Sequence, residues 1–107
     1  MTTEIKYKKN ILYLKINESL NKDTYYNFES EIVPIVLNLK INKLNINLSK
    51  VLNIDDIGIN SLIKVSSIIN GFNGEVDVRG INNSIRNILN ESDLFDYCND
   101  LSEGEIH

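Results

Sequence analysis

Segments with the alternating apolar–polar pattern of a strand and segments with the apolar spacing of a helix follow one another along this chain. Their order limits its possible folds more than any other feature. Near the N-terminus, two runs alternate apolar with polar residues and are joined by a tight turn at Lys9-Asn10, which predicts an antiparallel hairpin. The expected elements are strands at 4–9, 11–16, 43–49 and 75–78, helices at 23–39, 57–70 and 82–92, and a last short helix or turn at 94–97. This β-β-α-β-α-β-α order requires right-handed crossovers between parallel strands after the hairpin. We therefore expect an α/β domain with a mixed sheet of about four strands and helices packed on it.

Local signals indicate where the helices begin and end. Asp23 is a suitable N-cap for the first helix, and Asn82 or Asn83 for the third, because their side-chain oxygens accept backbone N–H groups. Gly71 is expected to end the second helix. Pro34 lies inside the first helix, where it removes one hydrogen bond and is expected to kink or split the helix.

Length and charge narrow the class of protein. The 107 residues, of which 42% are hydrophobic, suit one domain spanning 1–107 with one core. The net charge of −4 and the lack of a dense basic patch after Lys9 argue against nucleic acid as a partner. No stretch is apolar enough to span a bilayer, and the N-terminus has no apolar signal-peptide region. We therefore expect no membrane insertion and a cytoplasmic location.

The chain has a single cysteine, Cys98, and a single histidine, His107, which is its last residue. One thiol cannot form an internal disulfide, and a terminal histidine is rarely held in place. A Cys-His nucleophile pair or a zinc site is therefore not expected. We expect no catalytic residue, no metal and no cofactor.

Two adjacent carboxylates, Asp55 and Asp56, stand where a strand gives way to a helix. An acid–base pair must face one cleft, whereas neighbouring residues in an extended chain point to opposite faces. A magnesium site is a second possibility, since Mg²⁺ prefers carboxylate oxygens. N-capping is a third, because an aspartate at a helix start accepts backbone N–H bonds and contributes about 0.5–2 kcal/mol. Capping explains one carboxylate better than it explains the pair, so all three interpretations stay open at this point.

The segment around these aspartates resembles the central signature of STAS domains, the family of bacterial anti-sigma factor antagonists. It reads LNINLSKVLNIDDIGINSLIKV, whereas in the family a strand ending in Asp-Leu-Ser or similar leads through an apolar pair to Asp-Ser-Ser-Gly and a helix. NNSIRNILNESDLFDYC resembles the family's C-terminal pattern, and ILYLKINESLN resembles its second strand and the turn that follows. The C-terminal pattern is matched by Arg86, Leu89, Leu94 and Phe95. The resemblance covers about 4–98, which implies a core there and a C-terminal tail at 99–107.

The resemblance also implies a regulatory position. In family members regulated by phosphorylation, the first serine of Asp-Ser-Ser-Gly accepts phosphate from a partner kinase that is also the anti-sigma factor. Asp55 matches the family's aspartate, Asp56 the phosphoacceptor serine, Ile57 the next residue and Gly58 the glycine. Asp56 has no hydroxyl group, and its single charge compares with about −1.5 to −2 for phosphoserine at pH 7. This departure implies a partial and permanent imitation of the phosphorylated state.

We therefore expect a non-enzymatic regulatory protein that controls transcription by binding a partner protein. The resemblance implies an anti-sigma factor of the ATP-binding serine kinase type, or another STAS protein. The expected interface is the start of the second helix, made by Asp55, Asp56, Ile57, Gly58 and Asn60, with nearby surface from Ser49 and Lys50. In this interpretation Asp55 caps the helix and Asp56 sets the interface charge. Gly58 lets a partner approach closely, and Ile57 is an apolar contact if it is exposed.

Three other functions stay open. The chain could be a scaffold that assembles with other STAS domains without a phosphate switch, or a soluble component of a membrane lipid- or anion-transport system. A nucleotide or small-molecule sensor could use the helix N-terminus as an anion site, but the Asp55-Asp56 pair would repel phosphate there. An enzyme ranks last, because no histidine, arginine cluster or glycine-rich phosphate loop accompanies the aspartates.

Overall fold

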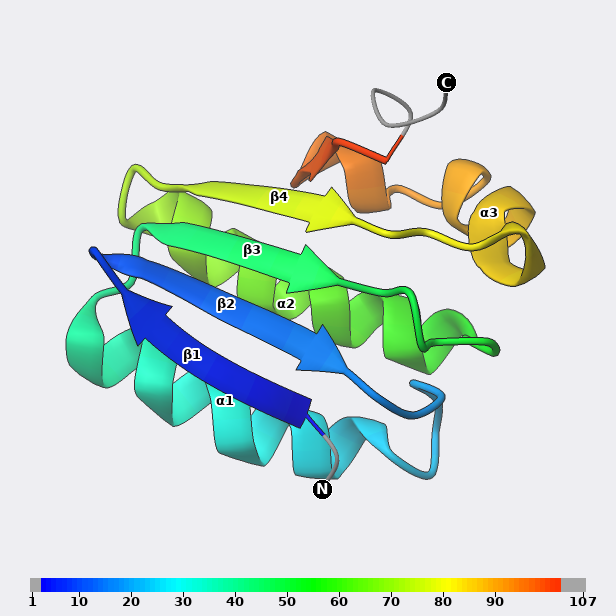
Figure 1. The fold of residues 1–107 in the computed structure, drawn as a ribbon, viewed down its shortest axis with the longest axis horizontal. Coiled ribbons are helices and arrows are strands. Elements are labelled where there is room, and N and C mark those ends of the chain that lie inside the picture. The colour runs from blue at the N-terminus through cyan, green and yellow to red at the C-terminus, as the bar shows by residue number, and fades with distance from the viewer. Residues whose placement is uncertain (1–2, 103–107) are drawn as a thin grey trace.

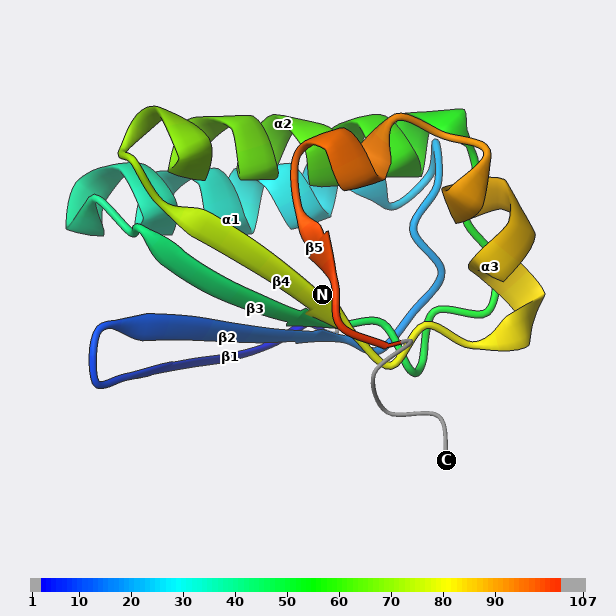
Figure 2. The ribbon, with the colours of Figure 1, turned by 90° about the horizontal axis from the view of Figure 1, so that it is seen from above.

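The computed structural model describes residues 3–102, which form a five-stranded sheet with two long helices on one face (Figures 1 and 2). The elements are β1 (Thr3–Lys8), β2 (Ile11–Ile16), α1 (Tyr25–Leu39), β3 (Lys43–Asn47), α2 (Asp56–Gly71), β4 (Glu75–Arg79), α3 (Asn83–Asn90), the 3-10 helix η1 (Leu94–Asp96) and β5 (Asn99–Asp100). The strands lie in the sheet in chain order. β1 pairs antiparallel with β2, and the other neighbouring pairs are parallel. The expected α/β class and mixed sheet are confirmed.

The register of the strands lines up their buried side chains beneath α1 and α2. One cross-strand row consists of Leu12, Leu44 and Val76, and the next of Leu14, Ile46 and Val78. The helices cover these rows with Phe28, Ile32 and Val36 from α1 and with Leu62, Val65 and Ile69 from α2. Each such side chain contributes about 1.5–3 kcal/mol when it is fully buried. None of the helices formed by residues 3–102 lies on the opposite face of the sheet (Figure 2).

The C-terminal edge of the sheet differs from the expected arrangement. Asn99–Asp100 form β5, although residues 99–107 are expected to be a tail. A two-residue strand is too short to show an alternation of apolar and polar residues, so the sequence contains no pattern that predicts it. The pairing continues where the backbone N–H of Leu101 donates to the carbonyl of Val78, and the side chain of Ser102 is buried. The remainder of the expected tail, 103–107, lies outside the described residues.

Two features of α1 differ from the sequence prediction: the residue at its N-cap and the effect of Pro34. The helix begins after Thr24 and not after Asp23, and no side chain caps it. Of the two effects expected of Pro34, a kink or a split, the split is wrong, because the helix continues through this residue. Pro34 and Ser30, whose carbonyl would have accepted the missing hydrogen bond, are both exposed, so water can satisfy that carbonyl. None of the described helices is long and apolar enough to cross a membrane.

The hairpin turn and the cap of α3 follow the sequence prediction. Lys9 and Asn10 both have positive φ, as a two-residue hairpin turn of type I′ requires. The side chain of Asn82 accepts a hydrogen bond from the backbone N–H of Ser84 and caps α3. These two local signals therefore fix both the hairpin register and the start of the third helix.

Cys98 is buried between η1 and β5. Burial, together with the charges of Asp100 and Asp77, raises the pKa of its thiol to about 12. The thiol is therefore protonated at neutral pH, and its Sγ donates to the carbonyl of Leu94. A protonated, buried thiol is a poor nucleophile.

Candidate functional site

The candidate site lies at the edge of the sheet where the parallel strands end. The arrowheads of β2, β3 and β4 point the same way in Figure 1, and the loops that follow these strands meet at that side of the molecule. α2 begins in the loop after β3. In open α/β sheets this edge is the usual place for binding sites, because the loops there are free to vary.

Asp55 organises the start of α2 with both of its carboxylate oxygens. Oδ1 accepts the backbone N–H of Gly58 at 2.8 Å, and Oδ2 accepts the backbone N–H of Lys22 at 3.0 Å. The bond from Gly58 lowers the pKa of Asp55 most; slight burial opposes this shift, and the bond from Lys22 reinforces it. The expected capping role of Asp55 is therefore present, and the same carboxylate also fastens the loop between β2 and α1.

Gly58 has an internal role that differs from the expected one. A Cβ atom at Gly58 would lie 2.1 Å from the carbonyl oxygen of Leu20 and 3.0 Å from Cγ1 of Ile54. Leu20 in turn forms a parallel bridge with Ile54, in which the N–H of Leu20 donates to the carbonyl of Asn53. Gly58 is buried and lets the β2–α1 loop, not a partner protein, approach the helix.

The outer surface of the helix start is formed by the residues between these anchors. Asp56, Ile57 and Asn60 are exposed, and Asp56 makes no hydrogen bond or ion pair with the described residues. Ile57 is 41% exposed, and Leu52 in the preceding loop is 58% exposed. Leu52 is not among the interface residues predicted from the sequence, because it belongs to an apolar run that resembles a buried strand. We call the exposed residues Leu52, Asp56, Ile57 and Asn60 the acidic helix start.

Ser49 and Lys50 lie at the other end of the β3–α2 loop. Both are exposed, and the N–H of Ser49 donates to Oδ1 of Asn47. Nδ2 of Asn82 donates to the carbonyl of Val51 at 2.7 Å, which holds this end of the loop against the start of α3. The structure therefore anchors the predicted site residues in two places, with Ser49 and Lys50 on the α3 side and Asp55 to Asn60 on the α1 side.

The arrangement of the aspartates does not suit a shared carboxylate site. Both oxygens of Asp55 point to backbone N–H groups of its own chain, whereas Asp56 is the exposed first residue of the helix. Among residues 3–102, no group of three or more His, Cys, Asp or Glu side chains is placed to hold a metal ion. The chemistry that this site offers is a fixed negative charge flanked by apolar surface.

Replacing Asp55 with alanine is expected to lower the free energy of unfolding by about 1–2 kcal/mol, because two backbone N–H groups lose their acceptor. Asp56→Ala is the matched control and should cost at most about 0.5 kcal/mol, since it removes only an exposed charge at the helix start. Urea denaturation of both variants measures the difference. Equal effects would contradict the assignment of Asp55 as the structural carboxylate.

The same comparison has a defined pH dependence. The folded pKa of Asp55 is below its ordinary value of 3.8, so its stabilising contribution is complete above that value. It is lost as the pH falls through the folded pKa. The difference between the natural protein and Asp55→Ala should therefore be constant near neutral pH and shrink in acid.

The fold defines the chain as a small α/β domain with a mixed sheet, helices on one face and an exposed helix start. Residues 2–104 match the STAS domain model, and the chain belongs to that family. A comparison with curated proteins finds no match.

Solved structures share the fold at low sequence identity. A candidate anti-sigma factor antagonist from Thermotoga maritima has a TM-score of 0.84 at 20% identity, covering 92% of this chain and 84% of that one. The Bacillus cell fate determinant SpoIIAA in its phosphorylated form has a TM-score of 0.72 at 12% identity, covering 96% and 94%. The murine anion transporter Slc26a9 has a TM-score of 0.67 at 16% identity, covering 81% of this chain but 14% of the transporter. At these identities the likeness supports the fold and nothing finer.

Proposed function

We propose that the chain is a non-enzymatic regulatory protein of the cytoplasm that binds a partner protein through the acidic helix start. The observation that carries this proposal is the contrast between Asp55 and Asp56. Asp55 is fully engaged in holding the loops, whereas Asp56 is exposed next to Ile57 and Leu52 and has no partner among the described residues. A helix start that is held by these hydrogen bonds and presents an exposed charge and exposed apolar side chains is suited to recognising another protein, because little ordering is needed on binding.

The charge at Asp56 defines the regulation that we propose. Asp56 stands at the position that matches the phosphoacceptor serine of the family, and SpoIIAA, a Bacillus protein of the same fold, has been solved in a phosphorylated form. A carboxylate supplies a permanent charge that is smaller than that of a phosphate group. We infer that the partner is an anti-sigma factor of the serine kinase type, or another STAS protein, and that the chain contributes to control of transcription without being phosphorylated at this position.

A second candidate function is a scaffold or a component of a membrane transport system. The likeness of the chain to a part of Slc26a9, an anion transporter, favours it. In that case the exposed Ile57 and Leu52 would contact another domain of a larger assembly, and ATP would have no effect on binding. The two candidates therefore differ in whether a kinase recognises the acidic helix start.

The test is an affinity capture from native cell lysate with the natural protein, Asp56→Ser and Asp56→Ala as baits, each with and without Mg-ATP. We expect Asp56→Ser to capture a serine kinase and to acquire phosphate on the introduced hydroxyl, and the natural protein to bind the same kinase more weakly. Mass spectrometry identifies the captured proteins and the phosphate. Asp56→Ala separates loss of charge from gain of a hydroxyl group. Capture of one non-kinase partner by all three baits, unaffected by ATP, would instead support the scaffold or transport function.

A further inference from the structure

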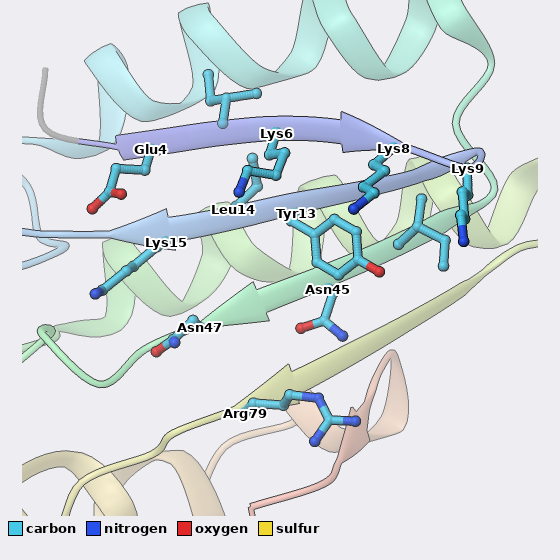
Figure 3. A pocket seen from close by; sticks show the side chains of 12 residues that line it. Glu4, Lys6, Lys8, Lys9, Tyr13, Leu14, Lys15, Asn45, Asn47 and Arg79 are labelled. Carbon is cyan, nitrogen blue, oxygen red and sulfur yellow. The ribbon is translucent and has the colours of Figure 1, made fainter.

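The face of the sheet that carries no helix has a chemical character opposite to that of the whole chain. A hollow of about 870 Å³ lies on this face and extends over β1, β2, β3 and the end of β4 (Figure 3). Its charged lining consists of Lys6, Lys8, Lys9, Lys15, Arg79 and Glu4. Five cations and one carboxylate therefore line this hollow in a protein whose net charge is −4, although Glu75 and Asp77 on β4 lie on the same face outside the lining. We call this surface the basic sheet face.

The register of the strands explains how these residues come together. One cross-strand row consists of Glu4, Lys15, Asn47 and Arg79, and the next of Lys6, Tyr13, Asn45 and Asp77. Neighbouring strands are about 4.8 Å apart, so each row crosses the sheet within about 15 Å. The sequence has no dense basic patch after Lys9. The folded chain does have one, because strand pairing places Lys15 and Arg79 on the same face as the N-terminal lysines.

Protection of an edge strand is the simplest alternative explanation, since lysines often prevent unwanted pairing at a sheet edge. It accounts for Lys6 and Lys8, because β1 is an edge strand. It does not account for Lys15 on β2, which lies inside the sheet. The described residues provide no ion-pair partner for Lys6, Lys8 or Lys15. A requirement beyond edge protection is needed to explain this concentration of charge.

We propose that the basic sheet face binds an extended acidic segment of a partner protein. The lysines supply positive charge, while the amide of Asn45 and the hydroxyl of Tyr13 have no hydrogen-bond partner among the described residues and can donate to carboxylates. The outer edge of β1, which pairs with no other strand among residues 3–102, offers backbone N–H and C=O groups to a segment that extends the sheet. Alternate side chains of such a segment lie about 6.8 Å apart on one face, the spacing at which Lys6 and Lys8 follow one another.

Other polyanions fit the basic sheet face less well. A single-stranded nucleic acid is usually held by several aromatic side chains, and Tyr13 is the one aromatic residue in the lining. Glu4 at one end of the hollow would repel a continuous phosphate backbone, whereas a peptide can place an uncharged residue there. A nucleic acid also cannot use the backbone groups of β1 as an added strand does. A planar membrane surface would meet the rim of the hollow before its floor.

The test measures binding of a fluorescent peptide of alternating Glu and Thr by anisotropy, at low and at physiological ionic strength. We expect the peptide to bind, the equivalent Gln-Thr peptide to bind at least about tenfold more weakly, and salt to weaken binding. Lys6→Gln and Lys15→Gln should each weaken binding about two- to fivefold. Lys40→Gln, which removes an exposed charge at the end of α1, is the matched control and should leave the affinity unchanged. Thermal unfolding verifies that the variants are folded.

Three outcomes would overturn the proposal. The first is equal affinity for the Glu and Gln peptides. The second is tighter binding of oligothymidylate or of anionic phospholipid vesicles than of the acidic peptide. The third is a large gain in peptide affinity for the double variant Glu103→Gln and Glu105→Gln, which would assign the face to the chain's own C-terminal carboxylates. Because the acidic helix start lies outside the hollow, capture through Asp56 can succeed or fail independently of this result.

Discussion

Replacing Gly58 with alanine should lower the free energy of unfolding by about 3 kcal/mol, one of the two largest effects that we expect. The added methyl group would lie 2.1 Å from the carbonyl oxygen of Leu20 and 2.6 Å from its carbonyl carbon. Both are backbone atoms, so relief requires movement of the loop between β2 and α1, which would strain the bridge between Leu20 and Ile54. Urea denaturation monitored by circular dichroism measures the loss.

Gly71→Ala provides the matched control for this substitution. Gly71 is the last residue of α2, and nothing lies within 4 Å of a Cβ atom placed there. Because alanine has the higher helix propensity, Gly71→Ala should be neutral or stabilise the protein by up to about 1 kcal/mol. If Gly58→Ala cost no more than this control, the close approach of Leu20 to α2 would not be a structural requirement. Strong destabilisation of Gly58→Ala would also explain why a family signature has glycine at this position without any contact to a partner.

The second large effect is expected at Arg86. Its Nη1 forms an ion pair with Oδ2 of Asp100 on β5, and the two side chains are only 18% and 16% exposed. Arg86→Met keeps much of the side-chain volume but leaves a carboxylate partly buried without its cation, so it should cost about 2–3 kcal/mol. The loss should depend little on salt, because pairs that are shielded from water are weakly screened.

Lys43→Met tests the same change in an exposed pair. Lys43 and Glu75 are 3.7 Å apart, with 57% and 65% of their side chains exposed. This pair should contribute no more than about 0.5 kcal/mol. A double-mutant cycle with Arg86→Met and Asp100→Asn isolates the interaction between those two side chains. A coupling energy near zero would mean that Arg86 stabilises α3 through packing and that β5 does not depend on it.

The spacing of the apolar residues, together with the turn and capping residues, predicted those helices and strands that are long or have distinct ends. The hairpin turn at Lys9-Asn10 and the cap at Asn82 follow from local chemistry, and the structure has both. β5 was not predicted because a two-residue strand shows no hydrophobic alternation, and Asp100 on β5 pairs with Arg86, which is 14 residues away in the sequence. The sequence prediction also placed Thr24 inside the first helix, directly after a cap at Asp23, whereas Thr24 occupies the cap position itself.

In the candidate site, too, contacts between residues that are close in the sequence could be predicted, whereas contacts between distant segments could not. Capping by Asp55 could be predicted, because its partner Gly58 lies three residues away. Its second bond, to the N–H of Lys22, joins segments that are 33 residues apart and has no signature in either segment. The internal role of Gly58 and the exposure of Leu52 depend on the path of the β2–α1 loop in the same way. The basic sheet face likewise exists only after the strands have paired.

The arrangement of strands in their chain order has a consequence for how the domain is made. A ribosome releases the N-terminal hairpin first, and each later strand then finds its neighbour already present at the growing edge of the sheet. No strand has to insert between two that are already paired, so synthesis and sheet growth proceed in the same direction. β5 is the last of the five strands to be synthesised, so the Arg86–Asp100 ion pair can form only after the other four strands have been made.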